Sequence, residues 1–146
     1  MNTMTRTPIP PLRLGADTTR LDIGVTAALV LLCLPYVLSG VAKLFGFSGA
    51  VAEFTAIGLP LPAVAVAATI ALQLGASALV ITQRLAWAGA LALAVFTIVA
   101  TLIAHPFWRF EGNARFAQTN IFFEHVGLVG AFLLVALLDW RRRYAA

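Results

Sequence analysis

The chain has 146 residues, of which 61% are hydrophobic and 11% are charged, whereas about 25% of residues are charged in an average soluble domain. A domain of this length buries only about 70% of its unfolded surface, so the apolar excess has to face lipid. The net charge is +4, but the basic residues sit at segment ends without interleaved stacking aromatics, which argues against nucleic acid as a partner. The single cysteine, Cys33, excludes a disulfide framework, a CxxC redox pair and a cysteine-based zinc site within one chain.

A polar leader, residues 1–22, precedes the first apolar stretch. Its Arg and Pro residues resemble the start of a secretory signal. The apolar run that follows is longer than the about 7–15 residues of a cleaved signal and lacks a small-residue cleavage site. We therefore expect the run to stay as a membrane anchor, with one transmembrane domain over 23–139 and a basic tail over 140–146.

Four apolar stretches carry most of the hydrophobicity, at residues 25–45, 62–82, 85–107 and 121–138. Each is close to the ~20 residues that cross a ~30 Å hydrocarbon layer as an α-helix. The strands of a membrane barrel would alternate in polarity, and these stretches do not. The sequence predicts an all-α membrane protein built as a bundle of four transmembrane helices.

The connection between the first two spans, residues 46–61, predicts a short helix at the membrane surface. Its large apolar side chains recur at helical spacing, at Phe47, Val51, Phe54 and Ile57. Glu53 falls on another face, and Gly58 with the prolines after it supplies a helix stop. The pattern fits an amphipathic cover over the bundle or a functional lid equally well.

The connection before the fourth span, residues 108–120, also predicts a surface segment. It mixes aromatic side chains with Arg109, Glu111 and Arg115. Thr119 and Asn120 are residue types that cap helix N-termini, so we expect the fourth helix to begin after them.

Lys and Arg residues are distributed unequally between the two sides of the predicted bundle. Three of them, Lys43, Arg109 and Arg115, fall on the side of the two long connections. Because cytoplasmic segments retain positive charge, the other side is expected to be cytoplasmic, with both termini. Trp87 and Trp140 would mark the inner interface and Trp108 the outer one. The seven residues on the cytoplasmic side are Arg6, Arg13, Arg20, Arg84, Arg141, Arg142 and Arg143.

The candidate ligand site consists of four ionisable residues, Lys43, His105, Glu124 and His125, at one depth near the outer surface. Ionisable groups in membrane spans mark sites by default. A polar pocket there could bind a quinone headgroup, with histidine donating to a carbonyl oxygen and glutamate relaying a proton. The structural alternative is an ion pair between Lys43 and Glu124, with interfacial histidines. Adjacent helical residues point about 100° apart, so Glu124 and His125 cannot both face the bundle axis.

Two other uses of the histidines are weaker hypotheses. His105 and His125 could ligate a b-type haem, but nothing in the pattern requires the clearance that haem needs. Together with Glu124 they also have the ligand types of a metal site, without a diagnostic spacing. The sequence therefore predicts no metal and no tightly bound cofactor, and leaves a quinone as the candidate ligand.

The remaining polar and small residues within the spans have packing explanations. Gln73, near the middle of the second span, is expected to hydrogen-bond another helix. Pro35 is expected to kink the first helix. Small residues four apart predict close helix approach at Ala71 with Gly75, at Ala86 with Ala90 and Ala94, and at Gly127 with Ala131.

Several segments together resemble the DoxX family of small membrane proteins. The resemblance covers most of 23–138. Its elements are Ser39-Gly40-x-x-Lys43, Gly58-Leu-Pro-x-Pro62, the single Arg84 between the second and third spans, His105-x-Phe107-Trp108, and Phe122-Phe123 before Gly127-x-x-Gly130. Many members carry an acidic residue at the position of Gln73 and a Lys-Asn pair at the position of Glu124-His125.

The resemblance implies a four-helix bundle in a prokaryotic plasma (inner) membrane that works with a redox enzyme. On this hypothesis the chain is a membrane subunit that offers its partner a quinone-linked or thiol-linked electron acceptor. A purely structural anchor or assembly factor and a small transporter subunit are the alternatives, although the first span lacks the deep acidic residue of four-helix multidrug exporters. The sequence leaves open the oligomeric state, a homo-oligomer included.

Overall fold

The structure, a computed structural model, describes residues 18–144. Its long helices α1, α3, α4 and α5 are each long and apolar enough to cross a membrane, and the short helix α2 lies between the first two, as the sequence predicted. Most of the predicted leader, with Arg6 and Arg13, and residues 145–146 of the tail lie outside the described residues. The elements are α1 (Thr18–Phe45), α2 (Phe47–Ala56), α3 (Pro62–Ile81), α4 (Ala86–Ala104), the 3-10 helix η1 (Phe107–Arg109) and α5 (Gly112–Tyr144).

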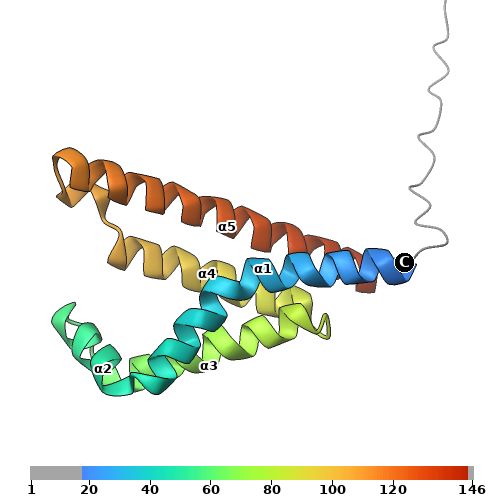
Figure 1. Cartoon of the computed structure of the whole chain (residues 1–146), viewed down its shortest axis with the longest axis horizontal. Helices are drawn as coiled ribbons and strands as arrows, with labels where there is room; N and C mark the ends of the chain where they lie inside the picture. The colour runs from blue at the N-terminus through green and yellow to red at the C-terminus, as the bar shows by residue number, and fades with distance from the viewer. Residues whose placement is uncertain (1–17, 145–146) are drawn as a thin grey trace, which may run out of the picture.

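The four long helices pack in the order α1, α3, α4, α5 (Figure 1). The start of α1, the turn between α3 and α4, and the end of α5 lie at one end of the bundle. We call this the basic end, because it holds Arg84, Arg141, Arg142 and Arg143. The opposite end, with α2 and η1, is called the α2 end.

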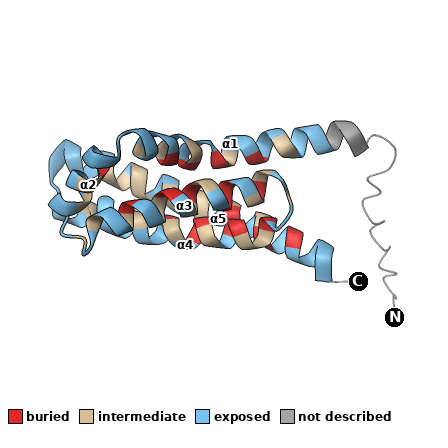
Figure 2. Ribbon diagram, turned by 90° about the horizontal axis from the view of Figure 1, so that it is seen from below, coloured by how far each residue is buried: buried red, intermediate tan, exposed pale blue. Residues whose placement is uncertain are grey.

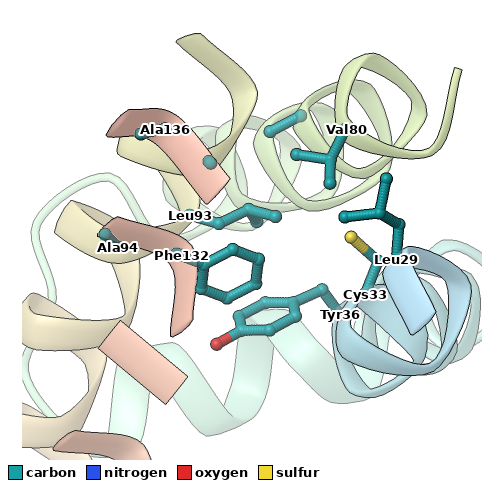
Figure 3. Close-up of a cluster of buried hydrophobic side chains, with 10 residues drawn as sticks. Leu29, Cys33, Tyr36, Val80, Leu93, Ala94, Phe132 and Ala136 are labelled. Carbon is teal, nitrogen blue, oxygen red and sulfur yellow. The ribbon is translucent and has the colours of Figure 1, made fainter. Parts of the chain in front are cut away.

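The core joins α1 to the α4–α5 pair. Figure 2 shows the buried residues of α1 on the side facing the other helices. In Figure 3 the ring of Tyr36 lies against Phe132, with centroids 5.3 Å apart. The Tyr36 hydroxyl also lies 2.6 Å from Oγ1 of the buried Thr97 on α4. An aromatic edge contact and one buried hydrogen bond therefore hold the middle of α1 to the bundle.

Helices α3 and α4 approach each other closely because their contact is lined by small residues. A Cβ atom added at Gly89 would lie 2.6 Å from the carbonyl oxygen of Ala76. The predicted stripe of Ala86, Ala90 and Ala94 is buried, as expected for a helix contact. The other predicted small-residue faces do not pack in this way, since Ala71, Gly75 and Gly127 are exposed.

Helix α2 ends where the sequence predicted. Ile57 caps it and Gly58 follows with a φ of +75°, a backbone conformation that glycine adopts without strain. Val51 and Phe54 pack with Ala50 against α3. Phe47 and Ile57 are exposed, so only half of the predicted apolar set of α2 contacts the bundle.

Helix α5 begins earlier than predicted. It starts at Gly112, with a φ of +55°, and continues through the segment expected to be a surface connection. Thr119 does not cap a helix, because its hydroxyl donates to the carbonyl of Arg115 at 2.8 Å, one turn back within α5. A helix of 33 residues is roughly 50 Å long, which exceeds the hydrocarbon layer. Its first turns therefore extend beyond the apolar stretch.

Helix α1 changes direction partway along its length (Figure 1). Pro35 lies inside it, and proline removes one backbone hydrogen bond and crowds the preceding turn. The bend confirms the predicted kink. It directs the second half of α1 toward α2 and α3 and away from the start of α5 (Figure 1).

A network centred on Asp139 joins three elements at the basic end. Its carboxylate accepts hydrogen bonds from Arg142 at 2.8 Å, from Arg143 at 2.9 Å and from the backbone N–H of Trp87 at 3.1 Å. Trp87 is in the first turn of α4, so Asp139 of α5 satisfies a helix N-terminal donor that α4 cannot satisfy itself. Arg143 also donates to the carbonyl of Gln83 in the α3–α4 turn at 2.7 Å.

Candidate functional site

His105 is held in place where α4 ends. Its backbone N–H donates to the carbonyl of Thr101 at 2.9 Å, and Pro106 follows it. Proline cannot continue the hydrogen-bond ladder of α4, so the chain leaves the helix here. The Nδ1 atom of the His105 ring lies 2.8 Å from Oε1 of Gln118, on the early part of α5.

His125 comes from α5 and faces α4. Its Nδ1 atom lies 2.9 Å from the hydroxyl oxygen of Thr101, which is buried. Thr101 therefore contacts both histidines, through its carbonyl to the backbone of His105 and through its hydroxyl to the ring of His125. The two imidazole rings lie edge to face, with centroids 5.1 Å apart. The structure thus brings His105 and His125 together at the α2 end.

The hydrogen bonds of the pair determine what each ring can offer to a ligand. Oε1 of Gln118 is an acceptor, so Nδ1 of His105 carries the proton and Nε2 of the neutral ring is an acceptor. The Thr101 hydroxyl can donate or accept, so the Nε2 atom of His125 can take either role. Among the described residues, none forms a hydrogen bond with either Nε2 atom. Both rings are half-buried, so these atoms are available to a ligand.

Aromatic side chains lie beside the two histidines. Phe107 of η1 packs edge to face on Phe122 of α5, with centroids 5.2 Å apart. Trp108 and Phe123 join the same group. We call these four residues the aromatic cluster. It lies next to the histidine pair, since Phe107 is two residues after His105 and Phe122 is one helical turn before His125.

Lys43 lies on α1 and is not a hydrogen-bond partner of either histidine. Its Nζ donates to Oγ of Ser39 at 2.6 Å, one turn earlier in α1. Ser39 also accepts from Nε2 of Gln73 on α3 at 3.2 Å, which confirms the predicted interhelical hydrogen bond of Gln73. The Oε1 atom of Gln73 is buried without a partner among the described residues. Lys43 thus belongs to a polar group between α1 and α3.

The predicted ion pair between Lys43 and Glu124 is wrong. The salt bridges among the described residues are those of Asp139 with Arg142 and Arg143. Glu124 is exposed, because its neighbour His125 takes the face of α5 that packs on α4 and adjacent positions point about 100° apart. The bend of α1 also turns the Lys43 end of that helix away from the start of α5 (Figure 1).

Sequence reasoning found the histidines but missed the residues that orient them. Gln118 and Thr101 had no signal of their own, because a polar residue becomes visible as a partner only when the helix pairing is known. Within residues 18–144, no three His, Cys, Asp or Glu side chains gather in a geometry that could hold a metal ion.

Comparison with known proteins places the chain among related membrane proteins. A family profile described as DoxX matches residues 24–106, from α1 to the proline after His105, and so includes His105 but not Glu124 or His125. The curated inner membrane protein YphA of Escherichia coli (strain K12) is 26% identical over 110 residues, which cover 75% of this chain and 79% of that protein. No solved structure gives a significant match. Because the family profile spans more than half of the sequence and the fold has four membrane-spanning helices, the chain belongs to the DoxX family of integral membrane proteins.

Proposed function

We propose that this chain is a membrane subunit of a redox enzyme and binds a quinone headgroup at the pair formed by His105 and His125. The observation that carries the proposal is the pairing of two imidazoles, 5.1 Å apart, each anchored through Nδ1 and each with an unbonded Nε2 atom among the described residues. Side chains anchored on one side present the other side to a ligand at low entropic cost.

The donor and acceptor pattern of the pair suits both forms of a quinone. A quinone carbonyl accepts hydrogen bonds, and Nε2 of His125 can donate one when the Thr101 hydroxyl donates to Nδ1. The hydroxyl of the quinol donates, and Nε2 of neutral His105 accepts. The aromatic cluster offers apolar surface for the flat ring of the headgroup.

The electrons in this proposal come from a partner. Reduction of a quinone takes two electrons and two protons; the imidazoles can exchange the protons, and a partner oxidoreductase supplies the electrons from its own reduced substrate. A thiol-linked carrier in place of the quinone is the other form of the same proposal. The redox association rests on the family resemblance, and the site rests on the geometry of the histidine pair.

Replacing His105 with alanine is expected to weaken binding of a quinol about tenfold or more, because the quinol hydroxyl loses the Nε2 atom to which it donates. The melting temperature without ligand should change little, since the His105 ring is only half-buried. Binding is measured by titrating the purified protein with the reduced quinol, decylubiquinol, under anaerobic conditions and following the thermal shift. Glu53→Gln, an exposed change on α2, is the control and should bind like the unmodified protein.

The anchor alternative makes the opposite forecast. It is favoured by the close packing of α3 on α4 at Gly89, which needs no ligand. On that alternative, saturating concentrations of several quinones leave the melting temperature of the unmodified protein unchanged. A flat titration would therefore reject the quinone site and leave the anchor function.

We place the chain in the bacterial plasma (inner) membrane with both termini in the cytoplasm. The relative from Escherichia coli is named as an inner membrane protein, and the basic end carries Arg84 and Arg141–Arg143, as expected of a cytoplasmic side. The histidine pair would then lie near the periplasmic surface.

A cysteine at Ala114, exposed in the first turn of α5, is expected to react with a membrane-impermeant maleimide added outside intact spheroplasts. The native Cys33 is fully buried and should not react. A separate variant, Arg84→Cys, has its cysteine in the exposed α3–α4 turn. It serves as the control and should react only after the membrane is opened. If position 114 were labelled from the cytoplasmic side alone, the topology would be the reverse of the one proposed.

A further inference from the structure

An apolar groove lies between α4 and α5 near the basic end. It has a volume of about 360 Å³ and is lined by Trp87, Leu91, Leu133, Ala136, Leu137 and Trp140. Several lining side chains are exposed, Leu137 by 56% and Leu133 by 43%. These residues are part of the apolar stretches of α4 and α5, so the groove opens toward the hydrocarbon of the bilayer.

Basic residues lie at the end of this groove. Leu133, Leu137 and Arg141 are spaced four apart on α5, so they form one stripe of the helix and Arg141 continues the groove wall toward the surface. Arg141 and Arg84 are exposed and form no hydrogen bond with another described side chain. Asp139 neutralises only part of the local charge, since Arg142 and Arg143 also lie there.

Aromatic residues beside the groove indicate where it lies relative to the bilayer surface. Trp87 and Trp140 pack edge to face with centroids 5.0 Å apart, and Trp140 also contacts Tyr144. Indole and phenol rings favour the headgroup level of a bilayer. The groove below the rings is thus at acyl-chain depth, and Arg141 above it is at phosphate depth.

We propose that this groove is a binding site for one anionic phospholipid, with an acyl chain along Leu133 and Leu137 and the phosphate at Arg141. The charge selects the ligand, because on the topology proposed above the groove lies on the cytoplasmic side, where basic pockets between helices bind anionic headgroups. A soluble protein could reach the arginines but could not fill a groove that opens into hydrocarbon. The site is independent of the quinone proposal, since it lies at the opposite end of the bundle.

The test compares two lipids with the same oleoyl chains, phosphatidylglycerol and phosphatidylcholine, by native mass spectrometry of the delipidated full chain. Phosphatidylglycerol is expected to bind at least fivefold more tightly. Arg141→Gln should remove about fivefold of that affinity, equivalent to the ~1 kcal/mol that a basic residue near a membrane surface contributes. Its melting temperature should not change, because Arg141 is exposed and unbonded among the described side chains.

Two further variants separate a built site from general attraction. Arg109→Gln removes the same charge at the α2 end and should leave the lipid affinity unchanged. Leu137→Trp fills the groove and should reduce lipid occupancy although every arginine is present. Equal binding of the two lipids, or an equal loss in Arg109→Gln, would overturn the proposal. A dimer that takes the place of the lipid adduct and is weakened by Leu137→Trp would also overturn it, since a second copy would then cover the groove.

Discussion

Replacing Asp139 with alanine is expected to lower the free energy of unfolding by about 2 kcal/mol, because the change removes the acceptor for the N–H of Trp87 and two charge-assisted hydrogen bonds, although the partly exposed arginines can still be solvated. The Asp139 side chain is only 5% exposed and accepts from Arg142, Arg143 and the N–H of Trp87. Without it the end of α5 loses its hydrogen bond to the start of α4, and the ring contact of Trp140 with Trp87 is left. Reversible unfolding in mixed detergent micelles measures the loss.

Two matched variants show whether the position or the charge matters. Asp139→Asn keeps an acceptor for the N–H of Trp87 but removes the negative charge, so roughly half of the loss is expected. Glu111→Ala removes an exposed carboxylate at the other end of the bundle and should be nearly neutral. If Asp139→Ala were as stable as Glu111→Ala, the network would contribute nothing to stability.

Replacing Gly89 with alanine is expected to cost about 2 kcal/mol through overpacking. The added methyl group would lie 2.6 Å from the carbonyl oxygen of Ala76 and 3.0 Å from Cβ of Leu79, so α3 and α4 have to move apart. The carbonyl belongs to the backbone of a helix and cannot turn away as a flexible side chain could. The unfolding assay used for Asp139 reports this loss as well.

Gly75→Ala is the control for this change, because nothing lies within 4 Å of the Cβ position at Gly75. Alanine also favours the helical backbone over glycine, so this variant should be at least as stable as the unmodified protein. Equal stability of the two variants would mean that α3 and α4 are farther apart than described.

Hydrophobicity predicted the four spans well, but it did not predict where helix α5 begins. The polar residues of 112–120 looked like a surface connection with Thr119 and Asn120 as caps, yet α5 runs through them from Gly112. Hydropathy reports which residues need lipid, whereas a helix continues into water as long as its backbone remains bonded. By contrast, the stop of α2 was predictable, because Gly58 with its positive φ is a local signal.

The position of an ionisable residue along the length of the bundle was predictable from the sequence, but the residues that it contacts were not. His105 and His125 both lay near the ends of adjacent antiparallel spans, so their contact follows from the order of the helices. Lys43 lay at a similar depth, but depth does not say which side of the bundle a residue occupies. Lys43 and Glu124 do not pair for two reasons. The kink in α1 turns the Lys43 end of that helix away from α5, and α5 is oriented so that His125 faces inward and Glu124 faces outward.

The most direct measurement for the quinone site is covalent capture with a photoreactive azidoquinone, followed by mass spectrometry of the labelled peptides. The label is expected on the α4–α5 hairpin, within residues 105–125, because the histidine pair and the aromatic cluster lie there. Excess unlabelled quinone should prevent this labelling, and His125→Ala, which removes the donor to the quinone carbonyl, should reduce it. A label spread evenly over all helices, or one that excess quinone does not displace, would contradict a quinone site at His105 and His125.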